Sequence, residues 1–122
     1  MTGVLVVLTE EQAAEVERGR FVRVGPVPEP IAAATLTGPA TVLLGKVDGL
    51  WRGYANVCRH RALPLDLGAR SPMSDDGRYL LCHQHGAIYR LRDGLCVSGP
   101  CAGEALTAVA VDAKDGELRV GG

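Results

Sequence analysis

The chain has 122 residues, including 16 glycines and 7 prolines, so it is rich in turn-forming residues. Hydrophobic residues make up 47% of it, enough for a packed core at this length, which excludes a disordered protein. Basic and acidic residues number 13 and 14, and the formal net charge of -1 excludes the positive field of a non-specific nucleic-acid binder. The composition predicts a single domain over residues 1–122.

The apolar segments are short. The longest, Gly3 to Leu8, is far below the roughly 20 residues that cross a bilayer. No basic stretch precedes it as in a secretory signal. We therefore expect a soluble, cytoplasmic protein without a membrane partner.

One short helix is predicted near the N-terminus, after the β-branched run Val4–Leu8. Thr9 can cap this helix, because Gln12 three residues later completes a capping box. We expect the helix over Glu10–Arg18, followed by an apolar stretch at Phe21–Val24. Its four glutamates are expected on a solvated face: Glu10, Glu11, Glu15 and Glu17.

The rest of the chain predicts short antiparallel strands. Residues 25–30 contain three prolines and should form an ordered surface loop, because proline disfavours both helix and central strand. Four Asp-Gly pairs predict tight turns between strands, at Asp48-Gly49, Asp76-Gly77, Asp93-Gly94 and Asp115-Gly116. Strands are expected at Thr41–Val47, Leu50–Asn56, Tyr79–Leu81, Ala87–Leu91, Leu106–Asp112 and Glu117–Val120. The predicted fold class is all-β.

Two clusters of potential metal ligands stand out: Cys58-Arg59-His60 and Cys82-His83-Gln84-His85, with Gly86 following. They read C-x-H and C-x-x-H-G, and each supplies one thiolate and one imidazole. Such a set suits zinc in one tetrahedron, or a two-iron cluster with both cysteines on one iron and both histidines on the other. One residue between Cys58 and His60 is tight for a zinc knuckle, which favours the cluster.

The two clusters resemble the ligand loops of the Rieske family, which read C-x-H and C-x-x-H-G. The resemblance extends through most of the chain, and includes Asn56–Arg61, Leu63-Pro64-Leu65 with Gly68, and His85–Tyr89. It implies a Rieske-like antiparallel β sandwich with one short N-terminal helix. It also implies a cluster-binding subdomain at about residues 57–101 and one [2Fe-2S] cluster per chain.

The resemblance also implies a role for each ligand. Carried over residue by residue, Cys58 and Cys82 bind the inner iron, and His60 and His85 bind the outer, more exposed iron. Replacing two thiolates by imidazoles removes negative charge, so an added electron is repelled less and the reduction potential is higher than in an all-cysteine cluster.

Family members tune this potential by hydrogen bonds to the sulfurs, from a serine directly after His-Gly and a tyrosine two residues later. Here Ala87 stands at the serine position and Tyr89 at the tyrosine position, which predicts a potential below that of the respiratory type. The alternative for Tyr89 is an ordinary aromatic core residue. Gly99 and Pro100 stand where the family places a proline loop over the cluster.

Three features depart from the family pattern. The gap between the ligand loops is longer than usual by a few residues, which we assign to a surface turn at Ala69–Arg78. His83 stands where the family often has proline, and we interpret it as a polar loop residue. Cys96 and Cys101 do not match the loop disulfide of the respiratory type, so they are expected as two buried or semi-buried thiols, with a local disulfide as the alternative.

The function implied by the resemblance is electron transfer without catalysis. A family oxygenase needs a second iron held by two further histidines and a carboxylate, and His83 is the only histidine left. No G-x-G-x-x-G motif is present to bind NAD(P)H. The expected donor is an NAD(P)H-dependent flavin reductase, and the expected acceptor a terminal oxygenase or similar protein. A zinc-stabilised binding module and a redox subunit tightly associated with a larger oxidoreductase are the alternatives.

Arginines flank both ligand loops: Arg59, Arg61, Arg90 and Arg92. A locally positive rim of this kind would steer an acidic partner. The alternative interpretation is an ordinary solvated surface.

Overall fold

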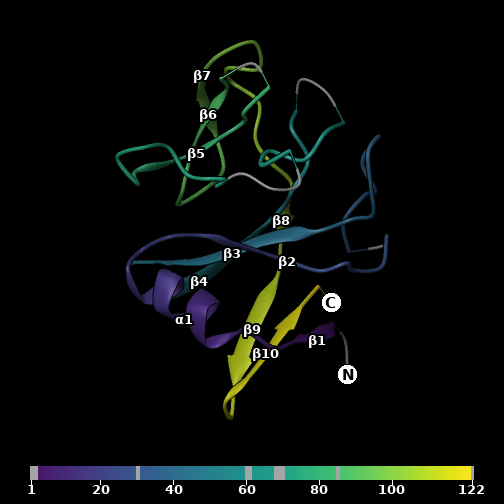
Figure 1. Ribbon diagram of the computed structural model, residues 1–122, viewed down its shortest axis with the longest axis vertical. Helices are drawn as coiled ribbons and strands as arrows, with labels where there is room; N and C mark the ends of the chain where they lie inside the picture. Colours follow the sequence, from purple (N-terminus) through teal and green to yellow (C-terminus); the bar gives the residue numbers. More distant parts are fainter. Residues whose placement is uncertain (1–2, 30, 60–61, 68–70, 85, 122) are drawn as a thin grey trace.

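The computed structural model describes residues 3–29, 31–59, 62–67, 71–84 and 86–121. This part of the chain forms three antiparallel sheets and the short helix α1 (Glu10–Glu17) (Figure 1). The first sheet has the strand order β1-β10-β9, the second β2-β3-β4-β8 and the third β5-β6-β7. The strands are β1 (Val4–Val6), β2 (Val22–Val24), β3 (Val42–Val47), β4 (Leu50–Ala55), β5 (Tyr79–Leu81), β6 (Ile88–Arg90), β7 (Cys96–Ser98), β8 (Ala108–Val109), β9 (Val111–Lys114) and β10 (Glu117–Val120).

The predicted helix and its cap are confirmed. The Gln12 backbone N–H donates to Thr9 Oγ1 at 3.0 Å, and the Thr9 backbone N–H donates to Gln12 Oε1 at 3.1 Å. These bonds satisfy donors that a helix start leaves unpaired. The helix ends at Glu17, one residue earlier than predicted, because Arg18 is the C-terminal cap. It buries Val16 and exposes most of its acidic side chains.

Two of the predicted Asp-Gly turns close hairpins directly. Asp48-Gly49 joins β3 to β4, and Asp115-Gly116 joins β9 to β10. All four residues have positive φ, between 53° and 78°. That backbone twist matches the twist of the flanking strands and favours Asp-Gly over bulkier pairs.

Two strand predictions differ from the structure. The segment expected as one strand over Leu106–Asp112 is divided, because β8 pairs with β4 in the second sheet and β9 pairs with β10 in the first. The chain passes between the sheets at Ala110, whose carbonyl accepts from the Gly121 N–H at 2.8 Å. The strand β7 was not predicted; it is three residues long, and its pairing with β6 is irregular between Ile88 and Tyr89.

The hydrophobic core has two parts. One lies between the first two sheets and is dominated by valines from both, which gives the sandwich arrangement expected. Val27, from the predicted proline-rich loop, is buried in it. The other part extends toward the β5-β6-β7 sheet, which Figure 1 shows at one end of the molecule, and contains all four cysteines. No helix within the described ranges has the length and apolar character of a membrane span.

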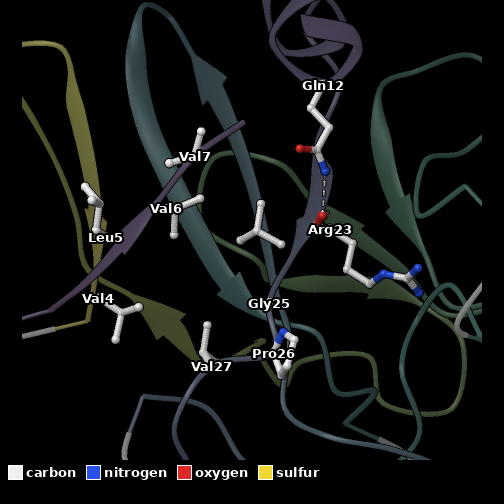
Figure 2. A pocket seen from close by; sticks show the side chains of 10 residues that line it. Val4, Leu5, Val6, Val7, Gln12, Arg23, Gly25, Pro26 and Val27 are labelled. Carbon is white, nitrogen blue, oxygen red and sulfur yellow. Dashed lines mark hydrogen bonds between the residues drawn. The ribbon is translucent and has the colours of Figure 1, made fainter. Parts of the chain in front are cut away.

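A groove lies away from the cysteines, between β1 and residues 23–27 (Figure 2). Apolar side chains of β1 form one wall, and Gly25, Pro26 and Val27 lie opposite. At one end of the groove, Gln12 Nε2 donates to the Arg23 carbonyl over a distance of 3.0 Å. Among its described lining residues there is no predicted metal ligand, so the groove is separate from the predicted cluster site.

The close contact between β3 and Phe21 predicts a strong effect of one methyl group. Gly45 is buried in β3, and a Cβ there would lie less than 3.0 Å from the Phe21 ring. That ring stacks on Tyr54 with 6.0 Å between centroids, so it has little freedom to move. We expect Gly45→Ala to lower the free energy of unfolding by about 1–3 kcal/mol in urea titrations.

Gly38→Ala is the matched control, because a Cβ at Gly38 would meet no atom within 4 Å. Its effect should stay within about 0.5 kcal/mol. Equal stability of the two variants would contradict the predicted steric role of Gly45.

Candidate metal centre

The first cysteine loop follows β4. The Cys58 N–H donates to the Leu63 carbonyl at 2.8 Å, and the Cys58 side chain is buried. The side chain of Asn56, fully buried, attaches this loop to the sheet. Its Oδ1 accepts from the Leu65 N–H at 2.9 Å, and its Nδ2 donates to Thr41 Oγ1 at 3.1 Å. Asn56 lies in a segment that resembles the Rieske family, but its anchoring role was not predicted from the sequence.

Asn56 also connects the loop to a buried carboxylate. Its Nδ2 donates to Asp66 Oδ1 at 3.3 Å, and Asp66 Oδ2 lies 3.1 Å from Nη1 of Arg23. Asp66 is almost completely buried, so the Arg23 charge compensates a carboxylate that would otherwise be costly to bury. The first loop is thereby fixed to β2 as well as to the start of β3.

The second cysteine loop follows β5 and contacts the first. The Cys82 N–H donates to the Ala87 carbonyl, and the Gly86 N–H donates to the Cys82 carbonyl, both at 2.9 Å. The His83 N–H donates to the Leu65 carbonyl at 3.0 Å, which joins the two loops. Cys58 and Cys82 belong to the same buried core cluster. Two of the four predicted ligands, His60 and His85, lie outside the described residues.

His83 is positioned within the second loop by its ring as well as by its backbone. Its Nε2 lies 2.6 Å from the Ser71 carbonyl oxygen, and the residue is partly exposed. This hydrogen-bonded position fits the interpretation of His83 as a polar loop residue.

Tyr89 brings a hydroxyl group to the first loop. It is fully buried in β6, and its Oη accepts from the Arg59 N–H at 3.1 Å. The same oxygen lies 3.6 Å from Cys58 Sγ and 3.0 Å from Cys101 Sγ. Burial, and then the hydrogen bond with Cys101, raises the pKa of Tyr89 well above its usual value. Tyr89 is therefore both a core aromatic and a neutral hydrogen-bonding group beside a predicted ligand.

Cys96 and Cys101 form a buried pair of thiols, as the preferred interpretation expected. Cys101 Sγ donates to Cys96 Sγ at 3.3 Å, and Cys96 Sγ donates to the Ser98 carbonyl at 3.2 Å. Burial, and then the hydrogen bond with Cys101, raises the pKa of Cys96 to about 11, so this thiol keeps its proton at neutral pH. The contact between Cys101 and Tyr89 was not predicted.

The turn at Gly99-Pro100 packs against the second cysteine loop. Gly99 has a φ of 105°, and a Cβ there would lie 2.8 Å from Ala87 Cα. Both the backbone conformation and the close approach require glycine at this position. Pro100 is exposed on the outer side of the turn.

The extra segment between the cysteine loops is more than a surface turn. Residues 69 and 70 lie outside the described residues, but Met73 is buried and pairs with Leu80 in an isolated β-bridge. Met73 Sδ accepts from the Phe21 N–H at 3.4 Å. The expectation of a surface turn at Ala69–Arg78 was wrong for Met73, whose unbranched side chain is buried in the core.

The predicted arginine rim is partly neutralised. Arg59 pairs with Glu104 at 3.5 Å, and Arg90 forms an ion pair with Asp93. Hydrogen bonding from Arg90 lowers the pKa of Asp93, so both partners stay charged. Arg92 is exposed, and Arg61 lies outside the described residues.

Comparison with known proteins assigns the family. The sequence profile of the Rieske [2Fe-2S] domain matches residues 10–113. The chain belongs to the Rieske family. Its cofactor is therefore a [2Fe-2S] cluster, as the cysteine and histidine pattern predicted. No curated protein sequence matches this Rieske chain significantly.

Solved structures share its all-β fold. The ferredoxin of carbazole 1,9a-dioxygenase from Nocardioides aromaticivorans IC177 has a TM-score of 0.64 and 18% identity, covering 99% of this chain and 98% of that chain. The Sphingomonas yanoikuyae B1 ferredoxin has a TM-score of 0.65 and 21% identity, with 99% of both chains covered. The terminal oxygenase of carbazole 1,9a-dioxygenase from Novosphingobium sp. KA1 has a TM-score of 0.64 and 26% identity, covering 97% of this chain but 29% of that chain.

The described part of the site fits the thiolate half of a Rieske cluster's ligand set. Cys58 and Cys82 are buried thiols on adjoining loops, where water has little access. The Tyr89 hydroxyl lies within reach of Cys58 Sγ, and hydrogen bonds to ligand sulfurs are a known means of adjusting a cluster's potential.

The buried Asn56 side chain predicts that the site depends on one amide. In Asn56→Ala, the Leu65 N–H and Asp66 would each lose a buried hydrogen-bond partner. We expect the free energy of unfolding to fall by about 1–3 kcal/mol or more, and the visible absorption of the holoprotein to decay faster on heating. Thr35→Ala, which removes a hydrogen bond to Gly38 in a separate loop, is the control. Equal decay rates in the two variants would count against the anchoring role.

Proposed function

We propose that this Rieske protein carries single electrons from an NAD(P)H-dependent flavin reductase to a terminal oxygenase or similar acceptor. The main support is the pair of buried cysteine loops, joined by the His83 N–H to Leu65 carbonyl hydrogen bond. The structural alignment covers 98% of one ferredoxin chain and 99% of another, which supports the role of an electron carrier rather than an enzyme. One neighbour is named as a ferredoxin of a dioxygenase and another as a terminal oxygenase, which supports the proposed class of partner.

The proposed ligands are Cys58 and Cys82 on the inner iron, and His60 and His85 on the outer iron. When bound, the cluster supplies a site that gains and loses one electron. The chain's own part is to hold both thiolates in a buried, hydrogen-bonded setting, so that little rearrangement accompanies a change of charge. Electron transfer of this kind needs no substrate pocket.

Three further residues are proposed to adjust or shield the cluster. Tyr89 places its hydroxyl 3.6 Å from Cys58 Sγ. Gly99 and Pro100 form the turn that packs against Ala87, which supports a shielding role over the second loop. We further propose residues 57–101 as the cluster-binding subdomain, and the cytoplasm as the location, where Cys96 and Cys101 would stay reduced.

The four cysteines provide a matched test, because all four are buried in the same core. Cys58→Ala and Cys82→Ala should each abolish bound iron and sulfide and the reduced cluster's EPR signal, since each removes a thiolate ligand. Cys96→Ala and Cys101→Ala should retain the cluster. Metal analysis and EPR of anaerobically purified protein, before and after dithionite, would measure both.

Three results would count against the proposal. One zinc per chain in colourless protein would support the zinc-stabilised module. Equal loss of iron in all four variants would show that core packing, rather than ligation, explains the effect. Stable co-purification with a larger enzyme would instead support a permanently associated redox subunit.

A further inference from the structure

A continuous chain of hydrogen bonds leads from the β7 strand to the first cysteine loop. The Cys96 thiol donates to the Ser98 carbonyl, and the Cys101 thiol donates to Cys96 Sγ at 3.3 Å. Cys101 Sγ then lies 3.0 Å from the Tyr89 hydroxyl, which lies 3.6 Å from Cys58 Sγ. The irregular pairing of β6 with β7 places Cys96 opposite Tyr89, so these two strands fix the positions of both residues in the series of hydrogen bonds.

Counting hydrogens gives the direction of each bond. A thiol and a phenol each have one hydrogen to donate. The Cys96 hydrogen is used on Ser98 and the Cys101 hydrogen on Cys96, so the hydrogen between Tyr89 and Cys101 belongs to Tyr89. The Arg59 N–H already donates to Tyr89 Oη, which orients the hydroxyl from its other side.

Two sulfurs therefore compete for one hydrogen, that of Tyr89. Cys101 Sγ is closer than Cys58 Sγ, at 3.0 Å against 3.6 Å. A hydrogen bond to a ligand sulfur stabilises the reduced, more negative cluster and raises its potential. When the Tyr89 hydroxyl donates to Cys101 Sγ instead, the reduction potential stays lower.

We propose that Cys101 is a positioning residue that draws the Tyr89 hydroxyl hydrogen away from the Cys58 sulfur, and that Cys96 orients the Cys101 thiol for this role. The proposal rests on the proposed function, in which Cys58 is a cluster ligand. The thiol pair thereby lowers the reduction potential of the cluster without touching it.

Two substitutions should release the hydroxyl by different routes. Cys101→Ala removes the competing acceptor. Cys96→Ala removes the acceptor of the Cys101 thiol, which then turns to donate to Tyr89 Oη and directs the phenol hydrogen toward Cys58. Both variants should shift the midpoint potential upward, equivalent to about two- to tenfold in the equilibrium constant for reduction.

The measurement is a redox titration of the holoprotein followed by EPR, with Tyr89→Phe completing a double-mutant cycle. Without the hydroxyl, Cys101→Ala should leave the potential unchanged, so the two substitutions should be non-additive. Leu106→Val is the control, because the Leu106 side chain lies in the same core but takes no part in the hydrogen bonds among Cys96, Cys101 and Tyr89. It should alter stability and leave the potential unchanged.

The failure of this inference is distinguishable from failure of the proposed function. Wild-type protein without a cluster would refute the proposed function. A cluster whose potential is unaffected by Cys101→Ala and Cys96→Ala, or shifts equally in the Tyr89→Phe background, would overturn the role of the thiol pair. If one alanine variant does not fold, the other reports on the same hydroxyl.

Discussion

The contact between the two cysteine loops is the constraint on which the site depends. Each loop closes on itself through a cysteine N–H, from Cys58 to Leu63 and from Cys82 to Ala87. The His83 N–H to Leu65 carbonyl bond then fixes one loop against the other. The loops follow β4 and β5, which belong to different sheets, so the packing of those sheets sets the relative position of the two thiols. A metal centre needs such support, because small displacements of its ligands weaken binding.

Features encoded by neighbouring residues could be predicted from the sequence. The capping box needs only Thr9 and Gln12, and the hairpin turns need only adjacent aspartate and glycine. The spacing within the cysteine and histidine clusters was equally local, and it led to the family that the sequence profile confirms. These signals act within a few residues, so tertiary context had little opportunity to override them.

Features that depend on distant contacts could not be predicted. Met73 becomes a core residue because Phe21 and Leu80 provide its surroundings. The three residues of β7 carry too short a pattern, yet their pairing brings Cys96 beside Tyr89. Cys96 and Cys101 were expected as two buried thiols, but the contact of Cys101 with Tyr89 depends on how the strands fold together. A hydrogen-bond network between separate strands leaves no periodic mark in the sequence.

The surface charges around the loops limit how this protein would meet a partner. Arg59 and Arg90 each pair with a carboxylate, Glu104 and Asp93, so their fields largely cancel at distances beyond a Debye length. Long-range steering by these arginines is therefore weak. Apolar side chains are exposed at Leu67, next to the first loop, and at Val97 on β7. For electron transfer of the proposed kind, short-range fit then matters more than attraction, which suits brief encounters with two successive partners.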